Sequence, residues 1–274
     1  FLDTFPVHQF VRTREGLWRE KLVDMDASSS GKLAFRLVLA RQPTPALSLL
    51  QPERGFLPIA DAAGKEHPAA KASSVEHKDK VTGKNKDTDD DSDKQKDKEE
   101  EKGDGQGQGL EVSPLQVSTC LSIAARISAA GGACLLVDYG PDLREAPAAV
   151  VEDSLRAFHR HTQVSPLSSP GQCDLTADVN FPRILHILQR RNPQIACLPL
   201  VTQGQFLMGL GIGERVRRLM EKDSTSAEEA EQLLAALKLL VGGEPGMGEA
   251  FKVMCLAHPD VAPHIAGFPS TDEA

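Results

Sequence analysis

The 274-residue sequence lacks the features that mark several large protein classes. Its five cysteines include no CxxC pair, which argues against a structural zinc site or a disulfide framework and fits a reducing compartment. No uninterrupted apolar stretch approaches the roughly 20 residues that span a bilayer, so membrane insertion is not expected. Basic residues are not in excess either. The formal net charge of −8 gives no support to nucleic-acid binding through phosphate neutralisation.

Hydrophobic residues are absent from one long internal stretch, between Thr82 and Gly109, where Lys, Asp, Glu, Gln and Gly dominate. Such a composition buries too little apolar surface to offset the entropy of ordering the chain. We therefore predict that residues 62–109 are a disordered low-complexity insertion in a surface loop. A solvated spacer is favoured over an acidic interaction segment.

The residues before this insertion have the pattern of a small β-structure. Pro6–Val11 and Leu17–Met25 flank the turn Thr13–Gly16, which predicts a two-stranded hairpin. Leu33–Leu39 predicts a further strand.

After the insertion, the sequence predicts a helix followed by a strand. Ser113 and Pro114 suit the cap and first turn of a helix that ends at Gly131. The apolar run Ala133–Val137 then predicts a strand buried on both faces in a parallel sheet. A helix that leads into such a strand is half of a doubly wound α/β unit, so the fold class is predicted as α/β.

Further signals predict the remaining elements. Asn180 or Asp178 suits the cap of a helix through Arg191, and a capping box opens another helix at Ser226. The other expected elements are a strand over 195–201, a helix from about Thr202 and a strand over 251–257. The GxGxG sequence Gly209–Gly213 follows helical residues instead of a strand, so it predicts a corner between helices and not a nucleotide-binding loop.

Acidic residues at predicted strand ends are the candidates for chemistry. Asp138 and Tyr139 follow the buried strand, and ligands of open α/β sheets bind at that end. Asp174, Thr176 and Asp178 precede a helix, where they can bind a cation or cap the helix. Both interpretations stay open from position alone. The sequence also lacks the GxSxG, HExxH and Walker patterns, and it predicts no metal site.

The order of several motifs resembles one enzyme family. These motifs are Phe1–Phe10, Val137–Gly140, Asp174–Phe181, Thr202–Leu207 and Gly246–Val253. Together they resemble the MidA family of S-adenosylmethionine-dependent methyltransferases, whose mitochondrial members are protein-arginine methyltransferases that act in assembly of respiratory complex I. The resemblance covers residues 1–60 and about 110–258.

The resemblance implies an α/β fold with a partial Rossmann-like class I methyltransferase core, helical additions and the disordered charged insertion. It implies that the family's glycine-rich cofactor loop lies upstream of Phe1. The expected division is 1–61 as the central part of the methyltransferase domain with the hairpin, 62–109 as the insertion, 110–260 as the carboxyl-terminal part of that domain, and 261–274 as a tail.

The resemblance also implies roles for named residues. Asp3 and Asp138 are expected to be catalytic, and Phe1 and Tyr139 to contact the cofactor S-adenosylmethionine. The residues expected to bind substrate are His8, Asp174, Thr176 and Asp178. The implied reaction is symmetric dimethylation of an arginine on a complex I subunit in the mitochondrial matrix, and homodimer formation stays open. The alternative is a catalytically silent complex I assembly factor that binds its partner; an unrelated α/β scaffold is the weakest option.

Overall fold

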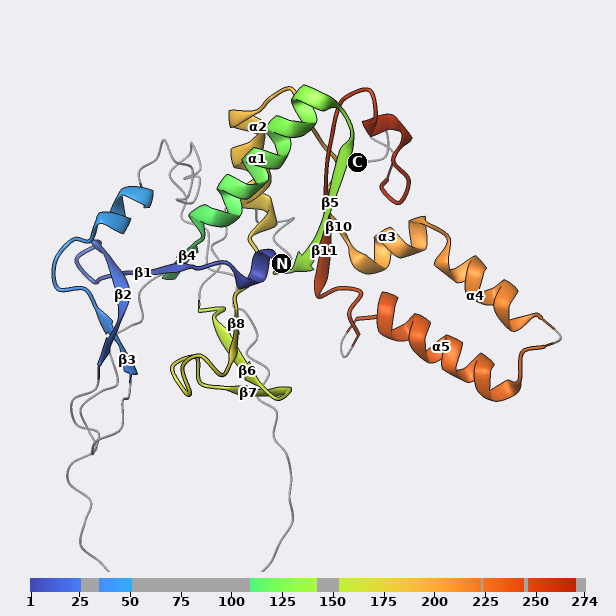
Figure 1. The fold of residues 1–274 in the computed structure, drawn as a ribbon, viewed down its shortest axis with the longest axis horizontal. Coiled ribbons are helices and arrows are strands. Elements are labelled where there is room, and N and C mark those ends of the chain that lie inside the picture. Colours follow the sequence, from blue (N-terminus) through green and yellow to red (C-terminus); the bar gives the residue numbers. More distant parts are fainter. Residues whose placement is uncertain (26–34, 51–108, 142–152, 223, 244–245, 270–274) are drawn as a thin grey trace, which may run out of the picture.

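The computed structural model describes residues 1–25, 35–50, 109–141, 153–222, 224–243 and 246–269 (Figure 1). The predicted insertion therefore lies outside the described residues, except for Gly109. The strands are β1 His8–Arg12, β2 Trp18–Met25, β3 Phe35–Leu39, β4 Gly109–Val112, β5 Ala133–Tyr139, β6 Arg156–His159, β7 Thr162–Val164, β8 Asp174–Thr176, β9 Ala196–Cys197, β10 Val201–Thr202 and β11 Phe251–Ala257. The α-helices are α1 Pro114–Ala130, α2 Phe181–Arg191, α3 Gln203–Gly209, α4 Ile212–Met220 and α5 Ala227–Val241, and the 3-10 helices are η1 Leu2–Thr4, η2 Pro45–Leu50 and η4 Ala262–His264.

The hairpin predicted near the start of the chain is confirmed. β1 and β2 pair antiparallel with Phe10 opposite Glu20, and the turn closes with a 2.9 Å hydrogen bond from Gly16 N to Thr13 O. Gly16 has φ +80°, a conformation that glycine adopts without steric cost. β3 and β4 complete a sheet in the order β3-β2-β1-β4, so the chain after the insertion returns to pair with β1.

The main core lies between a second sheet and two helices. β11 is its central strand, with β5 along one side and the short strands β9 and β10 along the other. α1 and α2 lie side by side and cover the sheet (Figure 1). Apolar side chains from these helices meet those of the strands; the largest fully buried ones here include Phe181, Leu188, Met254 and Leu256. Burial of each such side chain contributes about 1.5–3 kcal/mol.

The prediction that Ala133–Val137 is a strand of a parallel sheet, buried on both faces, is wrong for the described residues. The strand over Ala133–Val137 exists, but it pairs antiparallel with β11 along its whole length, from Ala133–Ala257 to Tyr139–Phe251. Leu135 and Val137 are 47% and 48% exposed, whereas Leu136 and Asp138 are buried. A purely apolar run cannot distinguish a strand buried on both faces from one buried on a single face, because the difference lies in its neighbours.

The predicted helix starts are confirmed by their caps. Ser113 caps α1, Asn180 caps α2, and Thr202 and Ser226 open α3 and α5 with capping boxes. The strand predicted over 195–201 is two short strands instead. Pro199 lies between them and has no N–H for a ladder hydrogen bond.

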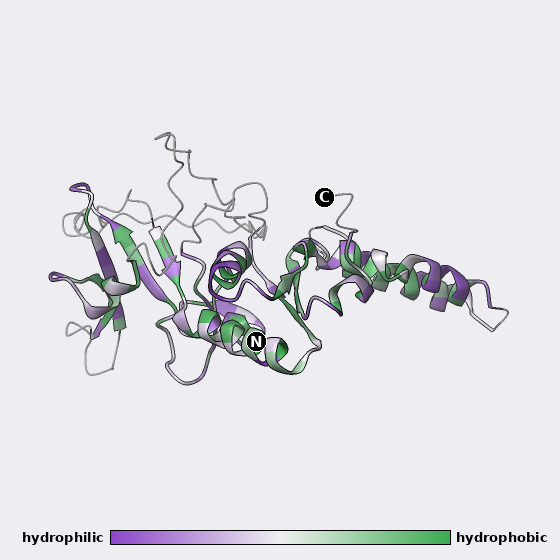
Figure 2. Ribbon diagram, turned by 90° about the horizontal axis from the view of Figure 1, so that it is seen from above, coloured by the Kyte–Doolittle hydropathy of each residue, from purple (hydrophilic) through white to green (hydrophobic). Residues whose placement is uncertain are grey.

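Helices α3, α4 and α5 form an arm that projects from the sheet (Figure 1). Hydrophilic and hydrophobic residues alternate along it (Figure 2), and neither α4 nor α5 has a buried residue. Gly209–Gly213 lies at the corner between α3 and α4, as predicted, with Gly211 in the left-handed conformation. Within the described part of the chain, no helix combines the length and apolar character needed to cross a membrane.

Candidate active site at the carboxyl end of β5

Asp138 anchors the start of the chain to the end of β5. Its side chain points to the buried face of the strand, and the residue is only 4% exposed. Oδ2 accepts hydrogen bonds from the backbone N–H groups of Leu2 (2.8 Å) and Asp3 (3.3 Å), and the nitrogen of Phe1 lies 3.1 Å away. Oδ1 accepts the N–H of Tyr139 at 2.9 Å. This carboxylate therefore serves as a cap for η1 and fixes the position of Asp3.

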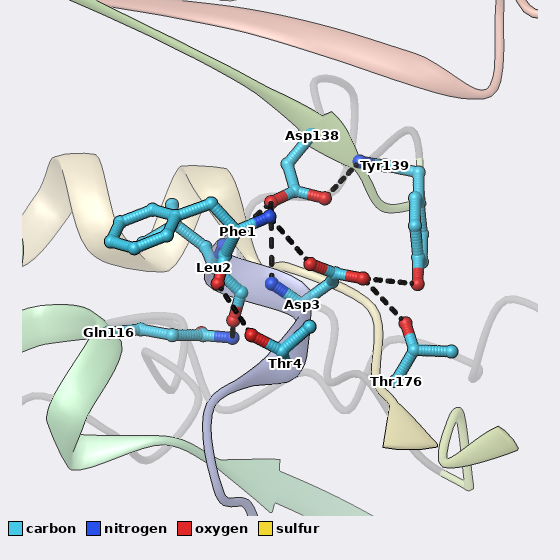
Figure 3. A network of polar contacts seen from close by, with 8 residues as sticks. All are labelled: Phe1, Leu2, Asp3, Thr4, Gln116, Asp138, Tyr139 and Thr176. Atoms are coloured by element: carbon cyan, nitrogen blue, oxygen red, sulfur yellow. Dashed lines mark hydrogen bonds and ion pairs between the residues drawn. The ribbon is translucent and has the colours of Figure 1, made fainter. Parts of the chain in front are cut away.

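Asp3 is the centre of a polar cluster (Figure 3). Its Oδ2 accepts hydrogen bonds from the Tyr139 hydroxyl at 2.7 Å and from Thr176 Oγ1 at 2.9 Å, and Oδ1 lies 2.7 Å from the nitrogen of Phe1. Burial alone would raise the pKa of Asp3, but the hydrogen bonds donated by Phe1, Tyr139 and Thr176 lower it. The carboxylate is therefore ionised at neutral pH.

Backbone and amide hydrogen bonds join the three segments that form this cluster. Ala177 N donates to Asp3 O at 2.9 Å, and Val179 N donates to Tyr139 O at 3.0 Å. The buried side chain of Gln116 on α1 donates to Leu2 O at 2.8 Å. The segment after β8 is thus held against both η1 and the end of β5.

Gly140 makes this close approach of segments feasible. A Cβ at this position would lie 2.2 Å from Val179 O, which is shorter than any tolerated contact. The same turn is held from the other side by the buried Lys252, whose Nζ donates to Gly140 O at 3.0 Å. The glycine after Asp138 and Tyr139 is therefore required by packing.

Tyr139 lies between an aromatic and a cationic neighbour. Its ring contacts Phe251 edge-on, with centroids 5.7 Å apart and an interplanar angle of 87°. The guanidinium carbon of Arg156 lies 5.2 Å from the ring centroid. Burial, followed by the hydrogen bond to Asp3, raises the pKa of Tyr139, so the phenol stays protonated and donates to that carboxylate.

A second polar chain extends from Arg156 to a buried glutamate. Arg156 Nη2 contacts Asp178 Oδ1, and the N–H of Asp178 donates to Ser154 Oγ at 2.8 Å. The Ser154 hydroxyl in turn donates to Glu111 Oε2, while Glu111 Oε1 accepts from Gln9 Nε2 at 2.6 Å. Burial raises the pKa of Glu111 despite these hydrogen bonds.

The structure thus brings together most of the residues that the sequence singled out. Phe1, Asp3, Asp138, Tyr139 and Thr176 form the cluster, and Asp178 lies beside it through its contact with Arg156.

The other two candidates do not join the cluster through any contact among the described residues. His8 Nδ1 pairs with Glu20 Oε1 at 2.7 Å on the hairpin, where its ring stacks on Phe10. Asp174 is an exposed residue at the start of β8.

Sequence reasoning did not single out four residues that support the site: Glu111, Gln116, Arg156 and Lys252. All but Arg156 are buried polar residues within largely apolar elements. A polar residue on the apolar side of a strand or helix is the signal that could have identified them, because burial requires a partner for each polar group.

The cluster is suited to a cationic ligand. It has an ionised carboxylate in a partly buried setting and an aromatic ring already next to a guanidinium. Within the described ranges, no three His, Cys, Asp or Glu side chains converge as a metal site. A sulfonium cofactor and a guanidinium substrate are both cations, so the residues present fit the acidic side of such a site.

The sequence of this chain is similar to those of known methyltransferases. A family model described as "Putative S-adenosyl-L-methionine-dependent methyltransferase" matches residues 1–196. The zebrafish (Danio rerio) protein named "Protein arginine methyltransferase NDUFAF7, mitochondrial" is 30% identical over 252 residues, which cover 92% of this chain and 44% of that protein. The human protein of the same name is 30% identical over 256 residues, covering 93% and 43%. The chain therefore spans less than half the length of these curated relatives.

Solved structures show the same fold. An uncharacterized protein from Burkholderia thailandensis aligns with a TM-score of 0.59 and 23% identity, over 93% of this chain and 53% of that one. A second protein from that organism, solved with bound S-adenosyl-homocysteine, aligns with a TM-score of 0.57 and 22% identity, over 93% and 51%. The predicted α/β class is confirmed. Since the family model covers well over half of the chain, the chain belongs to the MidA-like family of S-adenosyl-L-methionine-dependent methyltransferases, as its ordered motifs predicted.

Proposed function

We propose that this chain forms the substrate side of an S-adenosylmethionine-dependent protein arginine methyltransferase. The observation that carries the proposal is the ionised Asp3 carboxylate, held by Tyr139 and Thr176 at the carboxyl end of β5. The names of the relatives, which are about 30% identical, support arginine as the methylated residue.

The chemistry required of these residues follows from the charge of arginine. A guanidinium is protonated at any accessible pH, so the site must hold a cation and accept a proton as the nitrogen becomes methylated. Bound S-adenosylmethionine would supply the electrophilic methyl group. Asp3 would attract the guanidinium, orient it, and take the released proton on a carboxylate oxygen. Asp138 would act indirectly, by holding the backbone of Asp3 in place.

The finer parts of the proposal extend the family resemblance. We propose symmetric dimethylation as the outcome, a respiratory complex I subunit as the protein substrate, and the mitochondrial matrix as the location. The relatives are named as mitochondrial, which supports the compartment.

The decisive test is methyl transfer from radiolabelled S-adenosylmethionine to an arginine-containing peptide by the protein and by Asp3→Asn. Loss of the proton acceptor should lower kcat by about a hundredfold or more. Binding of S-adenosyl-homocysteine, followed by calorimetry, separates catalysis from cofactor affinity.

Asp24→Asn is the matched control, because Asp24 lies on β2 and pairs with Arg36 at 3.4 Å, away from the cluster. Its rate should equal that of the unmodified protein. An Asp3→Asn variant that keeps full activity would remove Asp3 from the reaction. A protein that binds its partner and transfers no methyl group would support the silent assembly factor instead.

A further inference from the structure

Arg156 shows where a guanidinium fits in this site. Its guanidinium carbon lies 5.2 Å from the centre of the Tyr139 ring, within the range of a cation–π contact. Its Nη2 contacts the Asp178 carboxylate. An aromatic face and a carboxylate are two groups that recognise a guanidinium effectively in proteins.

The pairing of Arg156 is nevertheless incomplete. Only one of its nitrogens has a hydrogen bond to Asp178, and its Nε is buried without a hydrogen-bond partner among the described residues. A bidentate pair through Nε and Nη2 would use two parallel N–H groups and would give Nε a partner. The contact therefore lacks part of the stabilisation that a well-aligned guanidinium would have here.

Arg156 is also placed so that its side chain can leave without moving the backbone. Its main chain is fixed in β6, where it pairs with Thr176 of β8. Its side chain is 35% exposed and that of Asp178 is 23% exposed, so solvent reaches both members of the pair. Rotation about the side-chain bonds of Arg156 would uncover the Tyr139 ring and the Asp178 carboxylate together.

We propose that Tyr139 and Asp178 form a guanidinium-binding subsite that Arg156 occupies, so that an arginine side chain of the substrate must displace Arg156 to bind. This inference rests on the proposed function for the identity of its ligand. Asp3 lies next to the subsite because its carboxylate accepts the Tyr139 hydroxyl and the Thr176 hydroxyl, so a substrate guanidinium bound in the subsite would lie near this ionised carboxylate. While Arg156 occupies the subsite, no substrate arginine can bind there. The apparent affinity for a substrate arginine is therefore reduced to the fraction of time that the subsite is free.

The single tyrosine of this sequence provides a direct probe. The protein is labelled with 3-fluorotyrosine, and the signal of Tyr139 is assigned by its loss in Tyr139→Phe. The tripeptide Gly-Arg-Gly is titrated while the ¹⁹F resonance is followed, with Gly-Lys-Gly as the comparison peptide. Arg156→Met should bind Gly-Arg-Gly about tenfold more tightly than the unmodified protein. Arg215→Met, which removes an exposed arginine from α4, should leave the affinity unchanged.

Arg156→Lys gives a second measurement if the methionine variant folds poorly. Lysine keeps the positive charge and lacks the planar guanidinium. The affinity of Arg156→Lys for Gly-Arg-Gly should therefore lie between those of the unmodified protein and Arg156→Met. Equal or weaker binding by both Arg156 variants would overturn the proposal and identify Arg156 as a residue that positions Asp178.

Methyl-transfer assays separate this inference from the proposed function. Transfer to arginine with an unchanged or raised KM in Arg156→Met would overturn the subsite and leave the proposed function standing. Tighter peptide binding in a protein that transfers no methyl group would support the subsite and remove the proposed function.

Discussion

The carboxyl end of β5 and the helical arm are built in opposite ways. The cluster at β5 draws its residues from η1, β5 and β8, and η1 lies more than 100 positions from the other two in the chain. Asp138 and Thr176 are buried, and Asp3 and Tyr139 are partly buried. The arm of α3, α4 and α5 is contiguous in sequence. Its caps and ion pairs join residues three or four apart, as in the pair of Arg218 with Glu214. The comparison shows that the candidate chemistry depends on long-range packing, while the arm depends on local sequence.

The largest expected effect is on stability, when one glycine in each of the two regions is replaced by alanine. In Gly140→Ala the new Cβ would lie 2.2 Å from Val179 O, so the segment that carries Thr176 and Asp178 must shift. We expect a loss of about 3 kcal/mol in the free energy of unfolding. In Gly213→Ala on the arm, the nearest atom is Met208 Cε at 3.5 Å. We expect a gain of about 0.5 kcal/mol there. Urea unfolding of both variants measures the contrast, and equal losses would contradict it.

A smaller effect is expected when the anchor of η1 is changed. Asp138→Asn replaces one of the two carboxylate oxygens by an NH2 group, which cannot accept a hydrogen bond. Either the N–H of Leu2 or that of Tyr139 therefore loses its acceptor. Leaving such buried donors unpaired costs about 2 kcal/mol. The control is Asp260→Asn, where the carboxylate is 89% exposed and the change should stay within about 0.5 kcal/mol. If thermal and urea unfolding gave the same stability for both variants, the anchoring role of Asp138 would be wrong.

The smallest effect is a dependence of stability on pH from Glu111. Burial raises its pKa above the ordinary value of 4.5. Its contribution to stability is therefore fully present below pH 4.5 and is lost as the pH rises through the raised pKa of the folded protein. Glu111→Gln keeps an acceptor for Gln9 and Ser154 and does not titrate. The stability of the unmodified protein relative to this variant should fall as the pH rises from about 4 to 7. A difference that stays constant over this range would show that Glu111 does not titrate differently on folding.

Sequence reasoning succeeded where the determinants are local. The ends of α1 and the extent of β11 followed from caps, glycines and an apolar run, and the capping box at Ser226 located α5. It also predicted Asp3, Tyr139 and Thr176 as candidate site residues, and their side chains are in contact in the structure. It did not foresee Arg156, because a single arginine at the start of a strand has no distinctive pattern. Its prediction of His8 as a substrate-binding residue stays a prediction; in the structure this side chain pairs with Glu20 on the hairpin.

The order of motifs by itself determined the family, and the local caps and apolar periods determined the α/β class and the starts of α1, α2, α3 and α5. Only the tertiary structure decided that Asp138 anchors η1, that Asp3 is the carboxylate at the centre of the cluster, and that Arg156 covers Tyr139. The physical reason is that a cap or a turn is fixed by hydrogen bonds between near neighbours. The role of a carboxylate, in contrast, depends on which donors the packing of distant segments brings to it.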